Sequence, residues 1–260
     1  MSLRFSTIAS SDLGLVRDGN EDSALLTGEL IAVADGMGGH AGGEVASKIA
    51  IDTLKQLSEV LGDSAIDHES REDLLMNITF SIDHEIAQAV SDDPTLAGMG
   101  TTLTALHLSE KTVELLHIGD SRAYQWTGKK LIQLSYDHTV MQELLDQGRL
   151  TPDEVLTHPQ RSMLTQALMG DSRIDPILSV FDVKVGDRFL LCSDGLTNVL
   201  SDLEIATIIK QRVDGEIVEA LIRAVHEKGA PDNITILWSE VVDDGESSPG
   251  ILIGAAGEKR

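Results

Sequence analysis

The sequence predicts an α+β domain in which sheets are flanked by helices. Two segments, 44–61 and 71–90, carry apolar residues at the three- to four-residue spacing of amphipathic helices. After residue 100 the pattern changes to strand-like stretches, at 101–108, 112–118 and 121–126. Long paired helices combined with short, closely spaced strands indicate sheets covered by helices rather than a parallel β/α repeat.

The remaining elements follow in order along the chain. An apolar run at 31–34 ends at Asp35 and predicts a buried strand that leads into the glycine-rich stretch 36–43. Hairpin turns are expected at 109–111 and at 119–120. Later strands are expected at 130–134, 176–181, 188–193 and 233–241, and later helices at 202–212 and 215–228.

Two segments are expected to lie apart from the sheets. Residues 137–170 are polar, with short helical pieces, and predict an excursion over the surface. Within residues 242–260, the run from residue 243 is Asp-Asp-Gly-Glu-Ser-Ser-Pro-Gly, a composition typical of a flexible acidic linker. We therefore expect the folded domain to span residues 1–241.

The overall charge is strongly negative, because 43 acidic residues stand against 20 basic ones in a chain of 260. A net charge of −23 repels nucleic-acid phosphates and favours divalent cations and basic partners. The single cysteine, Cys192, excludes an intrachain disulfide, and no apolar run has the length of a membrane span. We expect a cytoplasmic monomer that binds no nucleic acid.

Four aspartates lie in turns next to predicted strands: Asp35, Asp120, Asp194 and Asp232. Each one alone is a common turn residue, because aspartate stabilises turns without a metal. Carboxylates that converge at strand ends repel one another unless cations neutralise them. Oxygen ligands without a Cys or His pattern favour a hard ion such as Mg²⁺ or Mn²⁺.

These aspartates belong to six motifs, which occur at 16–22, 33–40, 100–102, 118–122, 192–196 and 232–233. The motifs resemble, in the same order, those of the metal-dependent PP2C-type (PPM) serine/threonine protein phosphatases of the bacterial branch. The resemblance covers roughly residues 5–240. It implies a four-layer α-β-β-α sandwich of two packed, mainly antiparallel sheets flanked by helix pairs.

The resemblance also implies two Mn²⁺ or Mg²⁺ ions per site, with a possible third. Asp35 would bridge two ions, and the backbone carbonyl of Gly36 would bind one of them. The other implied ligands are Asp194 and Asp232 for the second ion, Asp120 with Asp194 for the third, and Glu21 and Asp22 through water.

The implied reaction is hydrolysis of phosphoserine and phosphothreonine in proteins, by direct attack of a hydroxide that bridges the ions. Arg17 would bind the phosphate oxygens with its planar fork. His40 would protonate the leaving alkoxide, and His158 would lie near the substrate in the flap, the family's counterpart of 137–170. Serine/threonine kinases and their substrates are the implied partners. Bacterial relatives can continue into a membrane anchor, so the chain also fits the cytoplasmic catalytic part of such a protein.

Three other functions stay open, one of them a metal-dependent hydrolase of another substrate class. The pattern Gly36-x-Gly-Gly-x-x-Gly, between a strand and a helix, superficially resembles a dinucleotide-binding loop, although Asp35 would direct negative charge at the pyrophosphate. A pseudophosphatase would bind phosphoproteins without hydrolysing them. Loss of Asp35, Asp194 or Asp232 would favour it, and all three are present.

Overall fold

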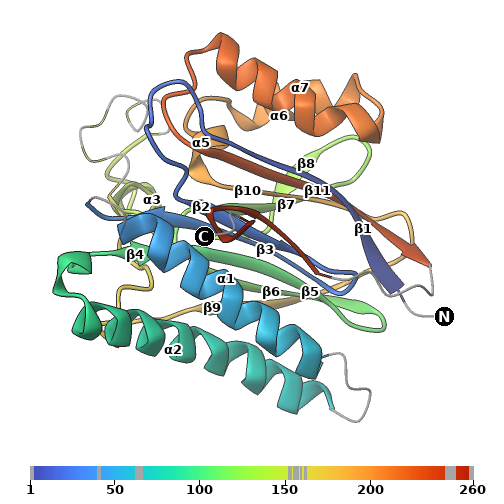
Figure 1. The fold of residues 1–260 in the computed structure, drawn as a ribbon. Coiled ribbons are helices and arrows are strands. Elements are labelled where there is room, and N and C mark those ends of the chain that lie inside the picture. Colours follow the sequence, from blue (N-terminus) through green and yellow to red (C-terminus); the bar gives the residue numbers. More distant parts are fainter. Residues whose placement is uncertain are drawn as a thin grey trace.

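The structure is a computed structural model that describes residues 3–39, 42–61, 67–151, 154, 158, 160, 163–243 and 250–257. Two antiparallel sheets pack face to face, and helix pairs cover their outer faces (Figure 1). This is the four-layer α-β-β-α arrangement that the sequence predicts, so the fold prediction is confirmed. Within the described residues, no helix combines the length and the hydrophobicity needed to cross a membrane.

The first sheet has five strands in the order β1-β11-β10-β7-β8. Their bounds are Leu3–Asp12, Ile234–Asp243, Arg188–Cys192, Arg122–Trp126 and Leu131–Gln133. Helices α6 and α7 cover its outer face, after the short helix α5. Their bounds are Asp202–Lys210, Asp214–Glu227 and, for α5, Asp194–Thr197.

The second sheet has the order β12-β2-β3-β5-β6-β9, with β4 paired to the end of β3. The bounds are Ile251–Gly254, Asp22–Leu26, Leu30–Met37, Leu103–Leu108, Thr112–Ile118, Ile177–Asp182 and, for β4, Gly100–Thr101. Its outer face is covered by α1 (Gly42–Leu61) and α2 (His68–Asp92). The surface segment after β8 contains α3 (Val140–Asp146).

Strand β3 shows why the apolar run before Asp35 is buried on both sides. Side chains alternate between the faces of a strand. Accordingly, Ala32 and Ala34 pack in the core beneath α1 and α2, whereas Ile31 and Val33 pack in the core between the two sheets. All four side chains are fully buried. The strand therefore lies in the middle of the sandwich and carries Asp35 to its edge.

Two expectations are wrong. Residues 119–120 do not close a hairpin, because β6 pairs with β5 and β9 in one sheet while β7 pairs with β10 and β8 in the other. This turn instead carries the chain between the sheets. The expected flexible tail also contains β12, whose apolar residues pair with β2 and cover its edge. The fold thus extends past residue 241, and residues 244–249 and 258–260 lie outside the described part.

Candidate metal centre

Two carboxylates stand opposite one another on neighbouring strands. Asp22, the first residue of β2, pairs directly with Asp35 of β3. Opposed residues of an antiparallel pair lie about 4.5–5.5 Å apart at Cα and project to the same face. Asp22 is only 1% exposed, and its Oδ2 accepts a hydrogen bond from Ser193 Oγ at 2.7 Å. Two ionised groups so placed repel each other, and a cation would remove the repulsion.

The edge of the first sheet brings two further aspartates to this place. Asp194 begins α5 immediately after β10, and Asp232 precedes β11. The backbone after Asp194 is in contact with the backbone after Asp232, because a Cβ at Gly195 would lie 1.9 Å from the carbonyl oxygen of Asn233. Only glycine allows this approach. The bond from Ser193 to Asp22 then links this edge to the other sheet.

Glycine also brings Glu21 against the end of β3. A Cβ at Gly36 would lie 2.1 Å from the carbonyl oxygen of Gly43 and 2.6 Å from that of Glu21. The Gly36 amide donates to the Glu21 carbonyl at 3.2 Å, and the Glu21 amide donates to Asn233 Oδ1 at 2.9 Å. Glu21 is therefore fixed by its backbone between the two sheets.

The turn that carries Asp120 is fastened to the same strand end. Thr102 Oγ1 accepts a hydrogen bond from the Asp35 amide at 3.0 Å and shares another with Ser121 Oγ at 2.8 Å. The Thr102 amide donates to the Asp35 carbonyl at 2.9 Å. Thr102 thus couples the two aspartate-bearing turns of the candidate site.

Burial and mutual repulsion raise the pKa values of these carboxyls. Burial raises the pKa of Asp22 to about 7, and burial followed by the charge of Asp194 raises the pKa of Asp120 to about 8. Burial and then Asp232 raise the pKa of Asp194 to about 6. The pKa of Asp35 is raised well above its ordinary value by burial and then by Asp22. Clustered acids that oppose one another's ionisation indicate a site for cations.

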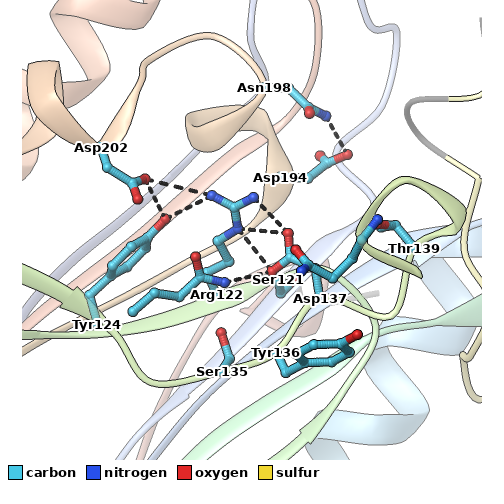
Figure 2. A network of polar contacts seen from close by, with 12 residues as sticks. Ser121, Arg122, Tyr124, Ser135, Tyr136, Asp137, Thr139, Asp194, Asn198 and Asp202 are labelled. Carbon is cyan, nitrogen blue, oxygen red and sulfur yellow. Dashed lines mark hydrogen bonds and ion pairs between the residues drawn. The ribbon is translucent and has the colours of Figure 1, made fainter. Parts of the chain in front are cut away.

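Arg17 lies at the open side of this cluster. Its Nη2 donates to Asp232 Oδ2 at 2.7 Å, with 48% and 32% of the two side chains exposed. This hydrogen bond raises the pKa of Arg17. Asp194 in turn accepts a hydrogen bond from Asn198 Nδ2 at 2.8 Å (Figure 2). Two candidate metal ligands, Asp232 and Asp194, therefore already accept hydrogen bonds from other side chains of the protein.

The donor set fits hard divalent ions that keep most of their water. Among the described residues, no three Asp, Glu, His or Cys side chains are already arranged as a complete ligand set. Mg²⁺-like ions need no such cage, since each takes one or two carboxylates and retains several waters. Carboxylates with raised pKa values, contributed by both sheets, meet that requirement.

Beside the site, Arg122 is the centre of a polar network (Figure 2). Its guanidinium donates to both carboxylate oxygens of Asp137, at 2.6–2.9 Å, and to Tyr124 Oη at 3.0 Å. Tyr124 in turn donates to Asp202 Oδ1 at 2.9 Å. Asp137 is the first residue of the 137–170 segment, so this network fixes where that segment leaves the sheet.

Two histidines were predicted for the site, His40 as the acid and His158 as a flap residue near the substrate. His40 lies outside the described residues. His158 is partly buried, and its Nδ1 accepts a hydrogen bond from the Gln160 amide at 3.2 Å. No contact described for it involves the aspartates. Sequence reasoning did not anticipate Ser193 or Asn198 as partners of site carboxylates, because serine and asparagine are common near turns and gave no separate signal.

Comparison with known proteins decides the family. The chain matches the family described as protein phosphatase 2C over residues 20–233. The chain belongs to the protein phosphatase 2C family. The predicted resemblance to this family is thereby confirmed.

Members of the protein phosphatase 2C family from several bacteria are similar to this chain. Serine/threonine protein phosphatase PstP of Mycobacterium tuberculosis is 42% identical over 252 residues, which are 95% of this chain and 47% of PstP. The chain thus spans about half the length of that relative. Serine/threonine phosphatase stp of Listeria monocytogenes is 33% identical over 240 residues, covering 88% of this chain and 93% of stp.

A solved structure of this family carries the implied metal. The catalytic domain of PstP, in complex with two manganese ions, superposes with a TM-score of 0.83 at 39% sequence identity. The match covers 93% of this chain and 100% of that domain. The predicted fold and the predicted metal therefore agree with this solved structure.

Proposed function

We propose that this chain is a metal-dependent protein phosphatase that hydrolyses phosphoserine and phosphothreonine monoesters. The observation that carries the proposal is the convergence of Asp22 and Asp35 from one sheet with Asp194 and Asp232 from the other. Family membership and the two manganese ions bound to PstP support it. Mn²⁺ or Mg²⁺, two per site with a possible third, are the proposed ions.

The side chains of this site hold ions and orient water. Bound divalent ions would lower the pKa of water and so supply a nucleophile near neutral pH. Asp35 and the carbonyl of Gly36 lie at the end of β3, where both sheets meet. The other residues proposed to hold the ions are Asp194, Asp232 and Asp120, with Glu21 and Asp22 acting through water.

Arg17 is proposed to bind the substrate phosphate. It approaches the carboxylates from the solvent side, where a phosphate would enter, and its planar fork suits two phosphate oxygens. A serine or threonine alkoxide is a poor leaving group, so an acid is needed. His40 remains our prediction for that acid, and His158 remains a predicted neighbour of the substrate.

The wider role is part of the same proposal. Serine/threonine kinases and their substrates are the proposed partners of a monomeric enzyme, and the buried single thiol of Cys192 suits the cytoplasm. No alternative is favoured by an observation. The ligands that a pseudophosphatase would lose are present. The backbone of Gly36 is packed against Glu21 rather than open to a pyrophosphate.

The test is metal-dependent hydrolysis by the purified chain. With Mn²⁺ it should hydrolyse p-nitrophenyl phosphate and phosphothreonine peptides, and EDTA should stop both reactions. Asp35→Asn should lose activity while its circular dichroism spectrum stays unchanged. The matched control is Asp92→Asn, an exposed aspartate at the end of α2, which should keep full activity. Full activity after complete chelation, or in Asp35→Asn, would overturn the proposal.

A further inference from the structure

A cavity of about 510 Å³ opens beside the end of β3. Its size lies within the range of about 300–1,000 Å³ that is usual for ligand sites. Four apolar side chains form much of its lining, and an ion pair stands among its polar residues. These lining residues are Met37, Leu164, Ala167, Met169, Asp171 and Arg173.

The cavity lies close to the proposed reaction site. Met37 is the last residue of β3 and lies two positions after Asp35. Because a strand rises about 3.3 Å per residue, the Cα atoms of Asp35 and Met37 are about 6–7 Å apart. An extended peptide has the same spacing between side chains that project to the same side. A substrate peptide that runs alongside β3 with its phosphoresidue at Asp35 would therefore place a residue two positions away at the cavity.

The apolar wall is built by two methionines that meet over a glycine. Met37 pairs with Gly100 in the β3–β4 ladder. A Cβ at Gly100 would lie 2.9 Å from Met169 Cγ and 3.1 Å from Met37 Cε, so any larger residue would displace both side chains. Met169 remains 43% exposed, which leaves its side chain available to a ligand.

A buried carboxylate holds this wall in place. Asp83 of α2 is 2% exposed and accepts hydrogen bonds from the amides of Met169, Gly170 and Ser172, at 3.0, 2.7 and 2.9 Å. The preceding Leu168 exchanges two backbone hydrogen bonds with Thr101 of β4, at 2.9 and 3.0 Å. The wall is thus formed before a substrate arrives, and little ordering is required on binding.

We propose that this cavity, which we call the methionine pocket, takes an apolar side chain of the substrate, two residues from the phosphoresidue. The inference rests on the proposed phosphatase function and specifies its substrates. Methionine side chains adapt to ligands of different shape, so Leu, Met and Phe should all fit. Asp171 and Arg173 form an ion pair at 2.6 Å, so the lining carries no net charge that would attract a charged side chain. Such a side chain would lose hydration there, and an acidic one also meets the net charge of −23.

The test uses phosphothreonine peptides that carry Leu, Met, Ala or Asp two residues before or two residues after the phosphothreonine. At one of these positions, Leu should give a kcat/KM about tenfold higher than Asp, the effect of partly burying one such side chain. Met169→Ala should reduce this preference, and Met169→Lys should reverse it toward Asp. p-Nitrophenyl phosphate, which has no flanking residues, measures the phosphatase activity of each variant separately from the peptide preference.

Leu203→Ala is the matched control, because Leu203 is 77% exposed on α6, which covers the other sheet. It should keep the wild-type preference. Equal kcat/KM values for Leu and Asp peptides at both positions would overturn the inference, and so would an unchanged preference in Met169→Lys. Failure to hydrolyse p-nitrophenyl phosphate would instead overturn the proposed function, so the two failures are distinguishable.

Discussion

Replacing Asp22 by Asn should stabilise the metal-free protein at pH 8 and at the same time reduce its phosphatase activity. Asp22 is 1% exposed and faces Asp35 across the β2–β3 ladder. The Asn side chain has nearly the same shape and can still accept the hydrogen bond from Ser193 Oγ. What it removes is a buried negative charge, which the proposed ions would otherwise neutralise.

The size and sign of the effect follow from the pKa of Asp22, which burial raises from 3.8 to about 7. In the unfolded chain the carboxyl ionises near pH 4, whereas in the folded protein it stays protonated until about pH 7. The folded state therefore loses stability as pH rises through this window. The difference of about 3 pH units corresponds to about 4 kcal/mol. The amide group of Asn, left without an acceptor, costs about 1–2 kcal/mol, so the net gain at pH 8 is about 2 kcal/mol.

Thermal unfolding in EDTA at pH 5 and pH 8 measures this gain. At pH 8 the variant should melt about 5 °C above the wild type, given about 2–4 °C per kcal/mol in a chain of this size. At pH 5 the raised pKa of Asp22 lowers the free energy of unfolding of the wild type by only about 1.6 kcal/mol. The stability gained by Asp22→Asn therefore falls to nearly zero. Saturating Mn²⁺ should remove the advantage at pH 8. The reasoning is refuted if Asp22→Asn gains equally at both pH values, or gains nothing at pH 8.

Two further predictions concern the site and its support. Asp194→Asn should lower kcat with p-nitrophenyl phosphate by roughly 100-fold or more, since a charge that holds the ion is lost, and near-normal turnover would contradict the ligand assignment. Arg122→Ala should lower the free energy of unfolding by about 2 kcal/mol in urea, because Asp137, with 8% of its side chain exposed, loses its cationic partner and keeps only the hydrogen bond from Gln133. Arg173→Ala is the control, because Arg173 is 84% exposed in its ion pair with Asp171. It should change the free energy of unfolding by less than about 0.5 kcal/mol. Similar losses in both variants would argue against a special role for Arg122.

Periodicity predicted the elements that are long or uniformly apolar. Helices α1 and α2 and strand β3 follow directly from repeating apolar positions, because each must bury a continuous face. Strand β1 was not predicted. It is an edge strand whose sequence is largely polar, and its strand conformation depends on ten residues of pairing with β11. Such pairing is a tertiary property that the local sequence does not contain.

The candidate site was predicted in composition but not in its contacts. Aspartates near strand ends predicted a cluster of carboxyls, because rigid strands deliver their ends to a common edge. Which of these carboxyls bind the ions stays a prediction. The sheet change at 119–120 could not be predicted, because a turn with glycine and aspartate serves a hairpin and a crossing between sheets equally well. The register that places Asp22 opposite Asp35 also depends on the whole sheet.

The ion pair between Arg17 and Asp232 predicts that Arg17→Ala lowers the Kd for Mn²⁺ and raises the KM for phosphopeptides. Asp232 is a proposed metal ligand, and Arg17 donates to it at 2.7 Å. An ion that binds Asp232 must therefore compete with the guanidinium. The pair is half exposed, so it is worth about 0.5–1 kcal/mol, and Arg17→Ala should bind Mn²⁺ about two- to fivefold more tightly.

The same Arg17→Ala variant should show a higher KM for phosphopeptides, because the phosphate loses its fork of donors. Arg17→Lys keeps the charge near Asp232 but not the fork, so its Mn²⁺ affinity should stay near that of the wild type while its KM rises. Calorimetric titration with Mn²⁺ and steady-state kinetics measure the two constants separately. Weaker Mn²⁺ binding by Arg17→Ala would show that Arg17 supports the metal site instead of competing for it. An unchanged KM would remove Arg17 from phosphate binding.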